Sequence, residues 1–120
     1  MKKSLKIIDD MLSKQGINYE FQRYKTDPSF PYFVGSYSEI PGTTEDGLQE
    51  ATFSLDGYHN GEWLTLENVK ESIKNMFDDF TTVEDGVGIA ITYENAIPIP
   101  IDSADMKRMQ INLKIKEWSV

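Results

Sequence analysis

The chain has 120 residues, a formal net charge of −8 and no cysteine. This length fits one domain, residues 1–120, with enough chain to bury a core. The lack of cysteine excludes disulfides, thiolate metal sites and a cysteine nucleophile. No apolar run approaches the roughly 20 residues of a membrane-spanning helix, so we expect a soluble, intracellular protein.

The N-terminal part predicts a helix and then a short strand. Ser4 is a candidate N-cap. The apolar residues that follow have helical spacing: Leu5, Ile8, Met11 and Leu12. Gly16 is a candidate left-handed stop on which Ile17 packs back. Alternating aromatic and polar residues then predict a strand from Tyr19 to about Tyr24.

Two further strands are expected in the next part of the chain. Residues 32–40 are rich in aromatic and β-branched side chains, and residues 51–56 alternate apolar with polar ones. The polar residues 41–47 between them predict an exposed loop. We expect the loop at residues 41–49 to offer a docking surface that becomes ordered on assembly.

A second helix is expected to begin after Thr65, a candidate N-cap, and to end at Asp78 and Asp79. One face of this helix is apolar: Leu66, Val69, Ile73, Met76 and Phe77. Trp63, just before the predicted helix, is a candidate to fasten the helix start to the sheet.

Residues 80–84 predict a short strand, and Asp85 with Gly86 predicts a two-residue hairpin turn. The next strand places these residues on one face: Val87, Ile89, Ile91 and Tyr93. Gly88 and Ala90 are the small residues of its other face, which predicts that a helix packs closely there.

Near the C-terminus, two prolines alternate with isoleucines. We call this the proline segment: Ile97, Pro98, Ile99, Pro100 and Ile101. An inner strand does not tolerate this pattern, because proline has no backbone N–H; the segment is therefore predicted to be an edge or connector that exposes apolar side chains. The final strand, within residues 108–118, alternates polar residues with four core candidates: Met109, Ile111, Leu113 and Ile115.

These elements predict an α+β fold with two helices on one face of a mostly antiparallel sheet of about five or six strands. The charges along it are uneven: residues 1–25 and 106–120 each have a net charge of +3, and the middle is acidic. Specific nucleic-acid binding needs a clustered basic face, so it is not expected. The acidic middle favours a solvated surface, with repulsion of a polyanion or attraction of a basic partner as alternatives.

The residues give little sign of catalysis. His59 is the sole histidine and lies in a glycine-rich turn context, which predicts an exposed loop residue. Three sequence pairs of carboxylates occur, but adjacent side chains point apart and do not form a dyad: Asp9-Asp10, Asp78-Asp79 and Glu84-Asp85. We therefore expect no enzyme, no catalytic residues, no cofactor and no metal.

Trp118 lies on the polar side of the last strand, together with Gln110, Asn112 and Lys114. An outward tryptophan fits an interface anchor, and a twisted strand end that places it over the core fits equally well.

Several segments of the chain resemble small tail proteins of siphophage-type phages and prophages of Gram-positive bacteria, above all the tail terminator (tail completion, minor tail) group. These segments are residues 32–37, 61–67, 93–100 and 107–115. The resemblance extends to the order of the predicted elements over nearly the whole chain. The resemblance implies an α+β protein that assembles as a hexameric ring, caps the tail tube and joins it to the head, with no catalytic residues or cofactors. It implies three partners: other copies of the chain, the tail tube protein and the head–tail connector.

On this resemblance the protein belongs to the virion tail and, during assembly, to the bacterial host cytoplasm. An acidic wall of a ring lumen would reduce sticking of the DNA that passes through it. The proline segment and Trp118 are then interface candidates. Two alternatives stay open: a head–tail connector, and a small acidic inhibitor or immunity-type module that masks a basic partner.

Overall fold

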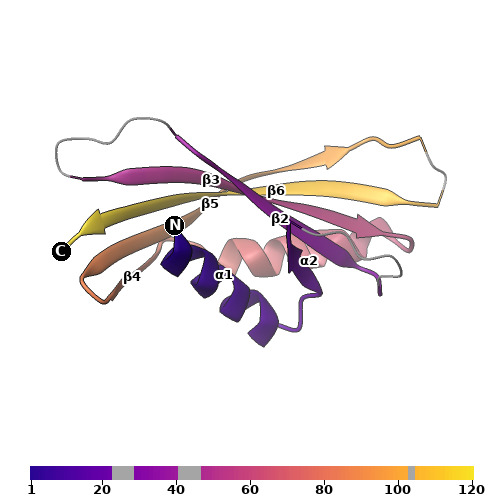
Figure 1. Cartoon of the computed structure of the whole chain (residues 1–120). Coiled ribbons are helices and arrows are strands. Elements are labelled where there is room, and N and C mark those ends of the chain that lie inside the picture. Colours follow the sequence, from indigo (N-terminus) through magenta and orange to yellow (C-terminus); the bar gives the residue numbers. More distant parts are fainter. Residues whose placement is uncertain (23–28, 41–46, 103–104) are drawn as a thin grey trace.

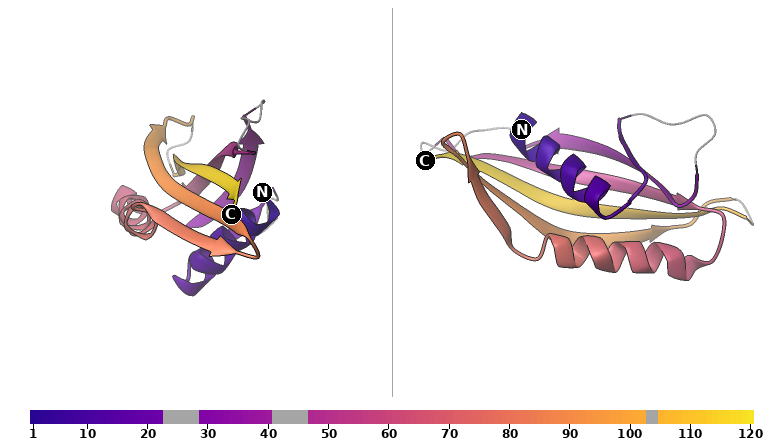
Figure 2. Two further views of the ribbon diagram at one scale, coloured as in Figure 1. Left: turned by 90° about the vertical axis from the view of Figure 1, so that its left-hand side faces the viewer. Right: turned by 90° about the horizontal axis from the view of Figure 1, so that it is seen from below.

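The computed structural model describes residues 1–22, 29–40, 47–102 and 105–120. These described residues form two helices and six strands: α1 (Lys2–Lys14), β1 (Tyr19–Phe21), β2 (Tyr32–Glu39), β3 (Gln49–His59), α2 (Trp63–Met76), β4 (Phe80–Glu84), β5 (Val87–Ile99) and β6 (Lys107–Ser119). The strands form one sheet in the order β1-β2-β3-β6-β5-β4. Among the described strands, β1 and β2 pair in parallel and the other four pairs are antiparallel. Both helices lie on one face of this curled sheet (Figure 1 and Figure 2), so the predicted α+β class is confirmed.

The core lies between the helices and the inner face of the sheet. The four core candidates of β6 are all buried, and their partners on β3 include the fully buried Ala51, Phe53 and Leu55. The helices contribute Ile8 and Leu12 from α1, and Leu66 and Ile73 from α2. Period-2 alternation in β6 thus identified the apolar layer correctly.

Both predicted N-caps are wrong. α1 begins at Lys2 with Met1 at its N-cap, and the backbone N–H of Leu5 donates to the Met1 carbonyl at 2.9 Å. Ser4 lies inside the first turn, fully buried, and its hydroxyl donates to the Glu117 carboxylate. Glu62 is the N-cap of α2, so Thr65 is a helical residue. The Ser4 hydroxyl was expected to cap its own helix, but it makes a long-range hydrogen bond to Glu117 of β6 instead.

The helix ends agree better with the sequence. Gly16 has a φ of +72°, and the N–H of Ile17 donates to the Leu12 carbonyl at 3.0 Å, as expected for a left-handed stop. α2 ends at Met76 with Phe77 at the C-cap, two residues before the acidic pair that was expected to end it. Trp63 is the first residue of α2 and packs against the core.

The strands lie close to their predicted ranges. β4 occupies residues 80–84, and the turn residues Asp85 and Gly86 have φ values of 50° and 77°, as a tight hairpin requires. β3 is longer than predicted and reaches His59. Residues 23–24 of the predicted first strand and residues 41–46 of the expected docking loop lie outside the described residues.

No helix packs on Gly88. A Cβ atom built there would lie 2.2 Å from Cε2 of Trp118, which stands opposite Gly88 across the β5–β6 pair. The expected packing of a helix against the small face of β5 is therefore wrong, because the indole of the neighbouring strand covers that site.

Candidate functional site

The second half of β5 is an edge of the described sheet. β4 pairs with β5 only over residues 87–91, whereas β6 pairs with it as far as Ile99. From Thr92 onward β5 therefore has no strand partner on that side within the described sheet. The prediction that the proline segment lies at an edge is confirmed for Ile97, Pro98 and Ile99; Pro100 and Ile101 follow the strand.

The geometry of the ladder explains how β5 accommodates Pro98. The N–H of Tyr93 donates to the Phe77 carbonyl and not to β6, at 2.9 Å. Tyr93, opposite Leu113, thus belongs to the antiparallel pairs whose backbone groups point away from β6. Pro98, opposite Met109, falls in the same class, so its nitrogen faces the open edge and removes no bond from the ladder.

A bulge reverses the alternation of β5. The register with β6 shifts between Tyr93 and Asn95, which leaves Glu94 as the extra residue. Before the bulge, the odd-numbered residues face the core. After it, Ile97 and Ile99 stand opposite Gln110 and Arg108, on the face of the sheet away from the helices. Ile97 is 44% exposed.

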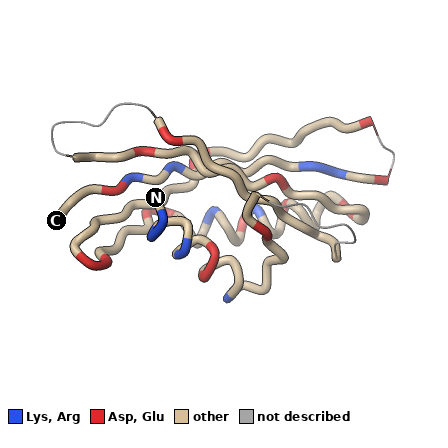
Figure 3. The backbone as a smooth tube through the Cα atoms, in the orientation of Figure 1, with Lys and Arg blue, Asp and Glu red and all other residues tan. Residues whose placement is uncertain are grey.

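This end of β5 is uncharged, whereas the neighbouring strands carry charged and polar side chains beside it on the outer face. No charged residue occurs between Glu94 and Asp102, as Figure 3 shows along the upper strand. On the strands beside it, an Arg108 guanidinium nitrogen lies 2.9 Å from Asp56, and the Asn112 amide donates to Asn95 at 2.8 Å. Ile97 is thus an apolar surface residue next to polar groups that already have partners.

Trp118 does not lie beside the proline segment. It is half-buried on the outer face, opposite Gly88, whereas Ile97 stands opposite Gln110. The eight residues from Gln110 to Trp118 correspond to about 26 Å of strand. The two groups of interface candidates therefore lie at opposite ends of the β5–β6 pair.

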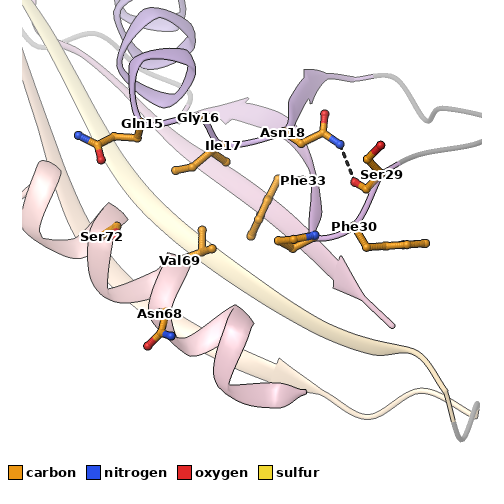
Figure 4. A pocket seen from close by; sticks show the side chains of 11 residues that line it. Gln15, Gly16, Ile17, Asn18, Ser29, Phe30, Phe33, Asn68, Val69 and Ser72 are labelled. Atoms are coloured by element: carbon orange, nitrogen blue, oxygen red, sulfur yellow. Dashed lines mark hydrogen bonds between the residues drawn. The ribbon is translucent and has the colours of Figure 1, made fainter. Parts of the chain in front are cut away.

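Sequence reasoning did not predict a pocket on the helix side of the sheet. Its volume is about 490 Å³. The walls come from the residues that follow α1, the segment before β2, the start of β2, and α2: Gln15, Gly16, Ile17, Asn18, Ser29, Phe30, Pro31, Phe33, Asn68, Val69 and Ser72. In Figure 4, Ile17, Phe33 and Val69 point toward the pocket, and Asn18 donates to the Ser29 carbonyl at 2.6 Å to one side. The pocket has an apolar floor and a neutral polar rim.

His59 is not the exposed loop residue that was expected. It is the last residue of β3, is half-buried and stands opposite Lys107. Its Nδ1 atom is buried and has no hydrogen-bond partner within the described part of the chain. Among these same residues, no group of three or more histidine, aspartate or glutamate side chains is arranged to hold a metal ion.

Within the described ranges, no helix has the length and apolar character needed to cross a membrane. Comparison of the chain with protein-family models and with curated proteins finds no match. The candidate site therefore rests on geometry: an uncharged, apolar strand end and a neutral pocket.

Proposed function

We propose that this chain is a structural protein of a phage tail, of the tail terminator type. In this proposal, copies of the chain form a ring that caps the tail tube and contributes to the head–tail junction. Its partners are further copies of itself, the tail tube protein and the connector. It acts in the virion tail, after assembly in the cytoplasm of the bacterial host.

The proline segment is the observation that carries the proposal. Its surface is apolar and uncharged, with Ile97 44% exposed. A water-exposed isoleucine beside two prolines gives a rigid contact surface whose burial requires little ordering of the backbone. Closed rings need such an adhesive surface on one side of each subunit and a complementary one elsewhere.

The proposal is tested by measuring assembly. Light scattering with size exclusion should show an oligomer of defined mass, and negative-stain images should show rings alone or at the ends of tail tubes. A monomer at all concentrations, with no binding to tubes, would refute it.

Matched variants connect the assembly to the proline segment. Ile97→Asp should weaken self-association at least tenfold, because it places a charge in an apolar contact. Val83→Asp introduces the same charge at a strand residue that is 58% exposed and lies on β4. That control should assemble like the parent. Ile99→Asp should likewise impair assembly far more than charge reversal of Lys114 or Lys116.

One observation favours the inhibitor alternative. Exposed carboxylates lie at both ends of β4: Asp78 and Asp79 before the strand, and Glu84 and Asp85 at its end. A basic protein partner would find a complementary surface there. Isolation of the chain with a stoichiometric basic partner, and without self-association, favours this alternative over the terminator.

A further inference from the structure

The surface of this chain offers two uncharged features that lie on opposite faces of the sheet. The proline segment projects Ile97 and Ile99 from the outer face. The 490 Å³ pocket opens between α1 and α2 on the inner side, and none of its lining residues is charged. A volume of this order is typical of sites that enclose a small ligand or a few side chains.

A second hollow near α1 has charged residues in its wall. Its volume is about 400 Å³, and the wall includes Asp10, Lys14 and Glu84. Charged groups there would lose hydration if an apolar segment covered them. The neutral pocket carries no such penalty, and its floor of Ile17, Phe33 and Val69 suits aliphatic side chains.

We infer that the neutral pocket between α1 and α2 receives the Ile97–Pro98–Ile99 end of β5 from a second copy of the chain. This inference rests on the proposed self-assembly and names the contact that produces it. The outer-face position of Ile97 and Ile99 separates them from the pocket of their own chain by the sheet. Each copy therefore offers one insert and one receptor, which is the head-to-tail arrangement of a ring.

Charge restricts where two copies of the chain can meet. Each chain has a net charge of −8, so two copies repel one another over most of their surfaces. A contact between two uncharged surfaces brings no carboxylates together. Gln15 and Asn68 bring side-chain amides to the pocket rim, and the pairing of β5 turns the Ala96 N–H away from β6, so the contact would bring polar groups that can pair to its border.

Because the chain has no cysteine, engineered cysteines give a direct test. Ile97→Cys protein is mixed with Asn68→Cys protein and oxidised, and the yield of the reducible mixed dimer is measured. Glu71→Cys is the control partner, since Glu71 is exposed on α2 but does not line the pocket. We expect the Asn68 pairing to exceed the Glu71 pairing at least tenfold.

A charge pair gives an independent test. Ile97→Lys and Ser72→Asp should each weaken association about tenfold or more, and the double variant should recover most of that loss. Circular dichroism of each variant checks that the fold is retained. Recovery in the double variant cannot come from misfolding and supports a direct contact.

The outcomes separate this inference from the proposed function. If the parent chain assembles but Asn68→Cys and Glu71→Cys cross-link equally, or the charge pair gives no recovery, the pocket is not the receptor. Retention of a small molecule by the monomer, seen in native mass spectrometry and lost in Val69→Asp, would also overturn the inference. If the parent does not assemble at all, the proposed function itself fails.

Discussion

The Ser4 hydroxyl donates a hydrogen bond to the Glu117 carboxylate across 113 positions of sequence. Ser4 is fully buried in α1, and Glu117 is 9% exposed near the end of β6. The other carboxylate oxygen of Glu117 lies 3.4 Å from the Met1 amino nitrogen. This pair ties the first helix to the last strand through a polar contact inside an otherwise apolar layer.

Replacement of Ser4 by alanine should therefore lower the free energy of unfolding by about 1.5–3 kcal/mol, because a buried carboxylate oxygen loses its donor. Urea unfolding followed by circular dichroism measures the change. Ser13→Ala, at an exposed position of the same helix, should change stability by less than about 0.5 kcal/mol. Equal losses in the two variants would contradict a specific role for the Ser4 contact.

Gly88→Ala should displace the Trp118 indole, since the added methyl would lie 2.2 Å from that ring. We expect a loss of about 1–3 kcal/mol in unfolding free energy and a red shift of Trp118 fluorescence. A Trp63→Phe background leaves Trp118 as the sole tryptophan. In the Gly88→Ala/Trp118→Ala double variant, the alanine at residue 88 should add little further loss. A full additional loss would mean that the clash lies elsewhere.

Pro98→Ala should leave the β5–β6 ladder intact, because the Pro98 nitrogen faces the open edge. The new N–H gives the edge an additional donor, so we expect faster sheet-type aggregation, measured by thioflavin fluorescence, with little change in unfolding free energy. Pro100→Ala, just beyond the strand, is the matched control. A large loss of stability in Pro98→Ala would show that the proline acts through the ladder and not at the edge.

Tyr19 makes stability fall at alkaline pH. Burial, together with the carboxylates of Asp9 and Glu20, raises the pKa of the Tyr19 phenol far above its ordinary value of 10.0. The unfolded chain thus loses this proton first, so the contribution of Tyr19 is complete below pH 10.0 and is lost as the pH rises toward the folded-state pKa.

Unfolding at about pH 9 and about pH 11 measures this effect against Tyr19→Phe, which lacks the titrating group. The difference in stability between the parent and Tyr19→Phe should move in favour of the variant at the higher pH. A difference that is independent of pH would rule out this linkage.

The fold class was predictable because its signals are local and repeated. Alternation in β6 and the Asp85-Gly86 turn each specify their structure within a few residues. The helix starts were not predictable, because Ser4 bonds to a strand more than a hundred residues away. The Trp118 indole covers Gly88 because the two residues stand opposite each other on β5 and β6, and this pairing is seen only in the folded sheet.

The candidate site was predictable only in part. Two prolines at residues 98 and 100 are enough to indicate an edge, since proline has no backbone donor. The face on which Ile97 lies follows from the register shift after Tyr93, which leaves no mark in a single sequence. The pocket unites Gln15, Phe33 and Asn68 from three separate elements, so it required the tertiary structure.

The bulge at Glu94 determines which deletions and insertions β5 can tolerate. Deletion of this one codon would remove the extra residue and leave the pairing on both sides of it unchanged, so Ile97 would still stand opposite Gln110 and Pro98 opposite Met109. An added residue between Ile97 and Ile99 would instead shift the phase of the strand end and turn Ile99 toward the helix side of the sheet. Deletion of Glu94 should therefore be better tolerated than an insertion between Ile97 and Ile99, which changes the face on which Ile99 lies.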